Sequence, residues 1–65
     1  MKAVIVDGYL DIRGTSAEEK PLEAIAVYDS TVNGVRKVNV SEGDTFFEAD
    51  TSEVFMFSNG EWVTI

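Results

Sequence analysis

Glycine interrupts this 65-residue chain at short intervals, and the segments between the glycines consist of residues that prefer strands. Valine, isoleucine, threonine and the aromatic residues fit a pleated, half-buried sheet better than a helix. The glycines are Gly8, Gly14, Gly34, Gly43 and Gly60. This spacing leaves room for short strands joined by turns and for little helix, so we expect a mainly β fold.

Length and apolar content predict one compact unit. The chain is 45% hydrophobic and contains no cysteine that could form a disulfide. A chain of about 60 residues buries only about 60% of the surface that its unfolded form exposes. We therefore expect residues 1–65 to form a single small β domain that depends on close packing or on self-association for its stability.

The composition excludes several kinds of chemistry. Cysteine and histidine are both absent, so the chain offers no thiolate nucleophile, no imidazole acid or base, and no ordinary zinc, haem or iron–sulfur site. The glycines match neither the G-x-G-x-x-G nor the G-x-x-x-x-G-K nucleotide motif. We expect no cofactor and no enzymatic activity.

The charge balance restricts the partners. Twelve acidic residues against five basic ones give a net charge of −7, and five cations are too few for the phosphate-neutralising patch that nucleic-acid binding requires. The longest apolar run, residues 3–6, is far shorter than the ~20 residues that span a bilayer. No charged segment leads into a long apolar one, as it does in a signal peptide. We expect a soluble, cytoplasmically made protein that binds neither nucleic acid nor membrane.

The N-terminal half predicts two strands and one helical turn. Residues 2–7 are a β-branched run, and residues 9–13 alternate apolar and polar side chains. Ser16 followed by Glu19 forms a capping box, so residues 16–20 are expected to make one helical turn.

The middle of the chain fits helix and strand about equally. Asn33-Gly34 favours strands, because this dipeptide readily takes the left-handed conformations of a type I′ turn. We expect residues 24–30 and 35–40 to form a hairpin or an open loop with a paired stem.

The C-terminal third predicts a three-stranded antiparallel meander. A two-residue turn at Asn59-Gly60 pairs Ser58 with Glu61 and Phe57 with Trp62. If Thr51-Ser52 is also a two-residue turn, the strand at residues 45–50 pairs with the next one so that Phe46 faces Phe57.

The two faces of this meander differ in character. One face is wholly apolar and is expected to be the core side; it carries Phe47, Ala49, Val54, Met56, Val63 and Ile65. The other face carries an aromatic stripe with Glu48 and Thr64 at its margin; the stripe consists of Phe46, Phe55, Phe57 and Trp62. The N-terminal strands could cover this stripe and make a small antiparallel sheet packed as a barrel or sandwich. Alternatively, the stripe is a binding or subunit interface.

Three acidic residues could in principle line one edge of the meander. Asp44, Glu48 and Asp50 supply the oxygen ligands that calcium prefers, but no D-x-D-x-D-G loop is present. Alternating acids on a strand usually form its solvated face. We therefore expect no metal site.

Three segments together resemble a pattern in small structural proteins of tailed-phage and prophage particles, including head-fibre-like proteins. These segments are GTSAEEKP (residues 14–21), GDTFFEADT (residues 43–51) and VFMFSNGEW (residues 54–62). The resemblance covers about half the chain, and its C-terminal part is the more specific. Two departures stand out. Ser52 replaces the usual glycine, and residues 22–42 are longer than the corresponding part of the pattern.

The resemblance implies a non-enzymatic capsid decoration or head-fibre-like component of the virion. It would act by docking onto copies of itself, a major capsid protein or another virion protein, with Phe46, Phe55, Phe57 and Trp62 as the interface. The alternative is a small acidic phage-encoded inhibitor that mimics the charge of DNA and blocks a host protein. The acids are spread along the chain instead of following one face, which favours the structural protein.

Overall fold

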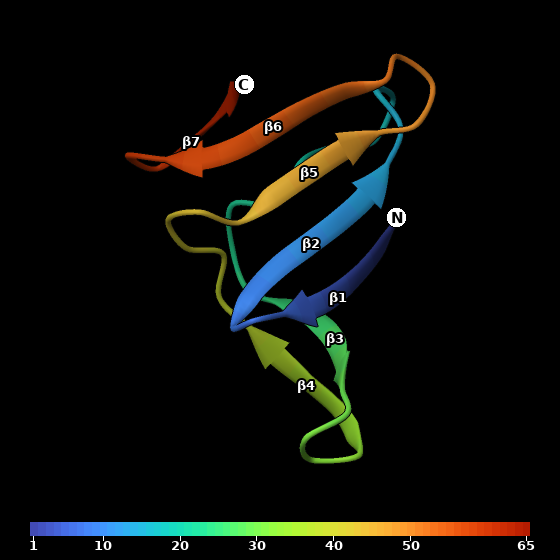
Figure 1. Ribbon diagram of the computed structural model, residues 1–65, viewed down its shortest axis with the longest axis vertical. Coiled ribbons are helices and arrows are strands. Elements are labelled where there is room, and N and C mark those ends of the chain that lie inside the picture. The colour runs from blue at the N-terminus through green and yellow to red at the C-terminus, as the bar shows by residue number, and fades with distance from the viewer.

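The computed structural model describes residues 1–65 as seven strands in one sheet, which confirms the mainly β prediction (Figure 1). The strand order across the sheet is β4-β3-β1-β2-β5-β6-β7. The bounds are β1 (Lys2–Val6), β2 (Tyr9–Gly14), β3 (Ile25–Asp29), β4 (Gly34–Val38), β5 (Thr45–Glu48), β6 (Glu53–Ser58) and β7 (Glu61–Thr64).

The sheet is mixed and open, whereas the sequence suggested an antiparallel barrel or sandwich. Strand β1 pairs in parallel with β3, and β2 pairs in parallel with β5. Parallel neighbours need a crossover connection, and residues 15–24 and 39–44 supply these crossovers. The four remaining pairings are antiparallel, and β4 and β7 are left as the two free edges.

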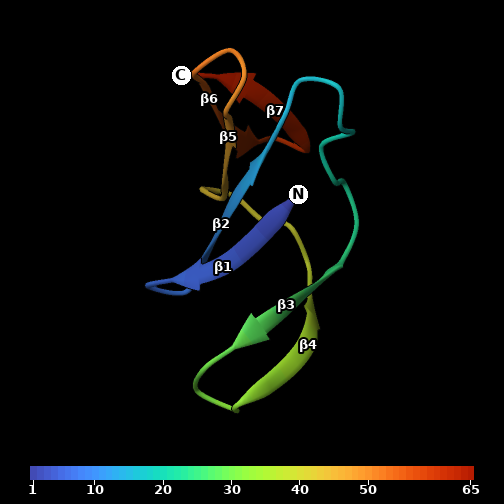
Figure 2. The same cartoon turned by 90° about the vertical axis from the view of Figure 1, so that its right-hand side faces the viewer.

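The core lies on one face of this curved sheet. Leu10, Ile12, Val27 and Phe46 are buried there and form one cluster. Residues 15–24, called the covering segment below, run along the same side of the sheet from the end of β2 to the start of β3 (Figure 2). We call the face that carries the core cluster the inner face and the opposite one the outer face.

The C-terminal meander forms as the sequence predicts. Strands β6 and β7 pair Ser58 with Glu61 and Phe57 with Trp62. Asn59 and Gly60 have φ of 52° and 79°, as a type I′ turn requires at both central positions. The turn dipeptide therefore sets the register of this hairpin.

The register between β5 and β6 differs from the expected one by two residues. Phe46 pairs with Phe55 and Glu48 with Glu53, so the connecting loop contains four residues instead of two. The Ser52 N–H donates to the Glu48 carbonyl at 2.8 Å, and Ser52 takes a φ of 63°. A shift of two leaves every side chain on its expected face, because side chains alternate with a period of two.

The expected helical turn at residues 16–20 is wrong. The chain makes a single turn one residue earlier, in which the Glu18 N–H donates to the Thr15 carbonyl at 3.2 Å. The Glu18 carboxylate accepts from the Thr15 N–H at 3.0 Å. The capping contact therefore uses Thr15 and Glu18, and β2 extends up to Gly14 immediately before it.

The middle of the chain adopts the open loop with a paired stem. Strands β3 and β4 pair Ile25 with Val38 and Asp29 with Gly34, and four turn residues separate them. Asn33 has a φ of 52°, but Gly34 already belongs to β4. Asn33-Gly34 is therefore not a two-residue turn.

Replacing Ser52 by glycine should stabilise the fold. A left-handed conformation costs a residue with a Cβ about 1–2 kcal/mol, and glycine avoids that cost while losing about 0.5–1 kcal/mol in chain entropy. We expect Ser52→Gly to raise the free energy of unfolding by about 0.5–1 kcal/mol in urea titrations. Ser30→Gly is the control, because Ser30 lies in a turn without positive φ. A loss of stability in Ser52→Gly equal to that in Ser30→Gly would contradict the assignment of strain.

Candidate functional site

The aromatic stripe belongs to the inner face. Phe46 is fully buried and Phe57 is 8% exposed, whereas Phe55 and Trp62 are half-buried. The Trp62 ring packs edge-on against both of its aromatic neighbours, with centroids 5.1 Å from Phe57 and 6.0 Å from Phe46. These edge-to-face contacts make the stripe part of the core.

The covering segment closes over this stripe through Lys20 and Pro21. The Lys20 ammonium lies 4.1 Å from the ring centroid of Phe55 and 4.9 Å from that of Phe46. The same ammonium donates to the Glu48 carboxylate at 2.5 Å. The Trp62 Nε1–H donates to the Pro21 carbonyl at 2.8 Å. An ion pair, two cation–π contacts and one hydrogen bond therefore hold the covering segment on the aromatic rings.

Glu48 is a buried carboxylate in this arrangement. Its side chain is 7% exposed, and it also accepts from the Thr51 hydroxyl at 2.7 Å. The hydrogen bonds from Lys20 and Thr51 hold the pKa of Glu48 below its ordinary value of 4.5, and they outweigh the effect of burial. The carboxylate is therefore charged at neutral pH and fixed in place.

The burial of the stripe bears on the interface expected from the sequence. Phe46 and Phe57 present almost no surface in this conformation, and Phe55 and Trp62 keep partial exposure. A contact between these four side chains and a partner stays a prediction, and it would require the covering segment to move.

The face expected to be the core of the meander is exposed, and that expectation is corrected. Val54, Met56, Val63 and Ile65 are 37%, 38%, 42% and 73% exposed on the outer face. Lys20 pairs with Glu48 on the opposite side, so the face with a polar margin can be the inside. The apolar face is left without a cover.

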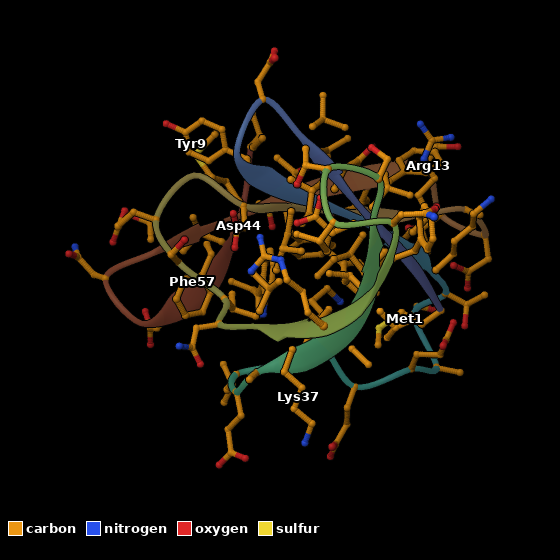
Figure 3. The ribbon with its side chains drawn as sticks, turned by 90° about the horizontal axis from the view of Figure 1, so that it is seen from below. Met1, Tyr9, Arg13, Lys37, Asp44 and Phe57 are labelled. Atoms are coloured by element: carbon orange, nitrogen blue, oxygen red, sulfur yellow. The ribbon has the colours of Figure 1, made fainter.

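The other two acidic residues considered for a cation serve internal hydrogen bonds. Asp44 is buried and accepts from the Leu10 N–H at 3.0 Å and from the Ser41 N–H at 2.8 Å. Asp50 accepts from the backbone and the hydroxyl of Ser16, which lowers the pKa of Asp50. Figure 3 shows Asp44 inside the molecule, whereas Tyr9 and Lys37 point outwards. No three side chains of the kinds that bind metals are grouped in the structure.

Asp29 closes the loop between β3 and β4. One carboxylate oxygen accepts from the backbone and the hydroxyl of Thr31 at 2.9 and 2.7 Å, and the other accepts from the Arg36 Nε–H at 2.6 Å. These contacts, with the Thr31 hydroxyl first and Arg36 second, lower the pKa of Asp29 to about 2. Asp29 therefore anchors this loop as a carboxylate.

The outer face is the most apolar surface of the molecule. Alternation along the paired strands places nine of the twelve large, exposed apolar side chains on it. They come from β1, β2, β3, β4 and β6 and from the C-terminal strand: Val4, Val6, Tyr9, Tyr28, Val35, Val54, Met56, Val63 and Ile65. Small hollows interrupt the face, including one of 190 Å³ between Val4 and Arg13.

The charge of the outer face differs from that of the whole chain. The strand pairings place three of the five cations on it, Lys2, Arg13 and Lys37, and only two of the twelve acids, Asp11 and Glu61. The face therefore has a charge of +1, whereas the chain has −7. Of the ten acidic residues that lie off this face, Asp29, Asp44 and Glu48 are buried and the other seven are at the surface.

Comparison with known protein families, curated proteins and solved structures finds no match to this chain. The resemblance to virion proteins of tailed phages therefore stays a prediction. The structure contains no helix that is long and apolar enough to cross a membrane.

The amino-acid sequence does not single out the outer face as a candidate site. Its residues on β6 and β7 were recognised as one apolar face, but apolarity alone assigned them to the core. The signal that could have corrected this is Lys20-Pro21, which supplies a cation that can cover Glu48 on the aromatic side.

Replacing Lys20 by methionine should leave Glu48 buried without its cation. In the wild type, the stability that this carboxylate contributes is present above its ordinary pKa of 4.5 and is lost as the pH falls through its lowered value. In Lys20→Met, burial would raise the pKa of Glu48 instead. We expect a lower urea midpoint at pH 7 and a partial recovery of stability when the pH is lowered toward that ordinary value.

Lys37→Met is the matched control for this variant, because Lys37 is exposed and makes no ion pair. Its midpoint should stay near that of the wild type at both pH values. Equal midpoints for Lys20→Met and Lys37→Met at pH 7 would contradict a structural role for the Lys20–Glu48 pair.

Asp29 should contribute to acid unfolding in a defined pH window. Its pKa is about 2 in the fold against an ordinary 3.8, so the stability it supplies is complete above 3.8 and is lost as the pH falls toward about 2. Asp29→Asn should flatten the fall of the urea midpoint in this window. Asp7→Asn is the control, because the Asp7 side chain lies exposed at the β1–β2 turn. Identical pH profiles for Asp29→Asn and the wild type would count against this anchoring role.

Proposed function

We propose that this chain is a non-enzymatic structural protein that docks onto another protein through the outer face of its sheet. The observation that carries the proposal is the set of exposed apolar side chains on that face. A contiguous apolar patch of more than a few hundred Å² is uncommon on a monomeric soluble protein and usually marks an interaction site.

The size of the face fits one side of a protein–protein interface. The strands stack along the longest axis of the molecule (Figure 1), and the two longer extents are 32 and 24 Å. A face of these dimensions offers an area of the order of 800 Å², which is what each partner buries in an interface of standard size. The aromatic Tyr9 and Tyr28 and the flexible Met56 are of the types enriched in such interfaces.

The resemblance to virion proteins supplies the class of partner that we propose for this face. A major capsid protein or another virion protein repeats many times over a particle, and a small module can decorate each copy. Weak contacts of one module become effective when several act together on such a repeating surface. The low net charge of the outer face avoids strong repulsion of either an acidic or a basic partner surface.

The acidic inhibitor remains the second proposal, and the contacts that the acidic side chains make within the chain do not favour it. Seven of the twelve acidic side chains accept hydrogen bonds or form ion pairs within the chain: Asp11, Glu18, Asp29, Glu42, Asp44, Glu48 and Asp50. A charge mimic of DNA needs carboxylates that are free to face a basic partner along one surface. Here most carboxylates position the backbone or neutralise a cation of the same chain.

Phage particles released by a host that carries the gene for this chain provide the test. Density-purified particles should contain the protein, and Met56→Lys should reduce its amount per particle by about tenfold, because a charge beside Val63 on the apolar face opposes docking. Ala17→Lys is the control, because it adds the same charge at an exposed position of the covering segment. Both variants should keep the circular dichroism of the wild type. Absence of the wild-type protein from the particles would overturn the virion proposal.

A further inference from the structure

The free edge of β7 carries unused backbone hydrogen-bonding groups. The Ile65 N–H donates to the Val54 carbonyl at 3.0 Å, so Ile65 belongs to a hydrogen-bonded pair with β6. Bonded and non-bonded pairs alternate along an antiparallel ladder. The N–H and C=O groups of Trp62 and Thr64 therefore point away from β6, and no hydrogen bond outside the sheet uses them.

The two edges of the sheet differ in how they are protected. Strand β4 carries Arg36 and Lys37, and charged side chains of this kind discourage pairing with another chain. Strand β7 reads Glu-Trp-Val-Thr and has neither a cation nor a proline. Tryptophan, valine and threonine are also good strand formers. The unprotected edge is therefore β7.

We propose that β7 pairs antiparallel with β7 of a second copy of this chain. A two-fold axis at Val63 places each Trp62 opposite the partner's Thr64. This register is self-complementary, because the two residues with outward N–H and C=O groups face each other in both halves. Moving the register by two residues toward the turn places Thr64 opposite Gly60, which lies outside β7 and has a φ of 79°.

The side chains fit this register as well as the backbone does. Val63 meets its own counterpart on the outer face, and Glu61 lies beside the partner's Ile65, so no like charges face each other. The two Glu61 residues lie about 14 Å apart along the strands at a rise of 3.4 Å per residue, which is beyond the Debye length of about 8 Å at physiological salt. By contrast, β4 paired with β4 would bring Arg36 and Lys37 close to their counterparts.

Pairing would also complete the outer face. Ile65 has the most exposed large apolar side chain at 73%, and it would gain a neighbouring strand. The two outer faces would continue across the axis, because a two-fold axis perpendicular to the sheet keeps both on the same side. This inference goes beyond the proposed function, since it concerns the edge of the sheet and a second copy instead of the face and a virion protein.

The test combines solution mass with amide exchange on the full chain. Light scattering should show the mass rising from 7.1 kDa to twice that value as the protein is concentrated. In the same range, exchange of the Trp62 and Thr64 amides should slow by about tenfold or more, because both become hydrogen-bonded. A single 7.1 kDa species at millimolar concentration would overturn the proposal. A dimer whose newly protected amides lie in β4 would overturn it too.

Two substitutions at Thr64 separate pairing from folding. Thr64→Pro removes an outward N–H and leaves the hydrogen bonds to β6, so this variant should fold and remain monomeric. Thr64→Val keeps the N–H and should dimerise as the wild type does. Dimerisation of Thr64→Pro at the wild-type concentration would contradict the β7 register. The Met56→Lys variant should still dimerise, so failure of face docking and failure of edge pairing give different results.

Discussion

The ion pair between Lys20 and Glu48 decides which face of the C-terminal sheet becomes the inside. The Glu48 side chain is only 7% exposed, and a buried carboxylate needs a partner. Lys20 supplies the partner, and Pro21 accepts a hydrogen bond from Trp62 next to it. The covering segment lies over the aromatic stripe at this point, and the opposite apolar face stays exposed.

Local sequence signals predicted much of the fold, because turns and alternation are local properties. The Asn59-Gly60 dipeptide predicted the last hairpin, and the period of two predicted which side chains of β5, β6 and β7 share a face, although not which face is the inside. The register of β5 against β6 was missed because it depends on the length of a loop. The sequence of that loop does not show that Ser52 adopts a left-handed conformation, which allows a four-residue loop.

The candidate site was harder to predict than the fold, because inside and outside are decided by contacts between distant parts of the chain. Val54, Met56 and Val63 are more apolar than the stripe with its Glu48 margin, so the sequence predicts that they are buried. The covering segment is long enough for only one side of the sheet. A small domain that covers one face leaves the other exposed, so the apolar character of Val54, Met56 and Val63 does not indicate that they are buried.

The joint between β1 and β3 has a mechanical consequence. One bridge, Val4 to Tyr28, connects the two strands, and a hollow of 380 Å³ lies beside it. The β3–β4 hairpin is therefore held against β1 by the packing of Val27 more than by backbone hydrogen bonds. Apolar packing is not directional. We expect the hairpin to shift against β1 more easily than it separates from it. We therefore expect the tilt of the β3–β4 hairpin against β1 to be the least constrained part of the geometry of this sheet, because a single bridge holds it.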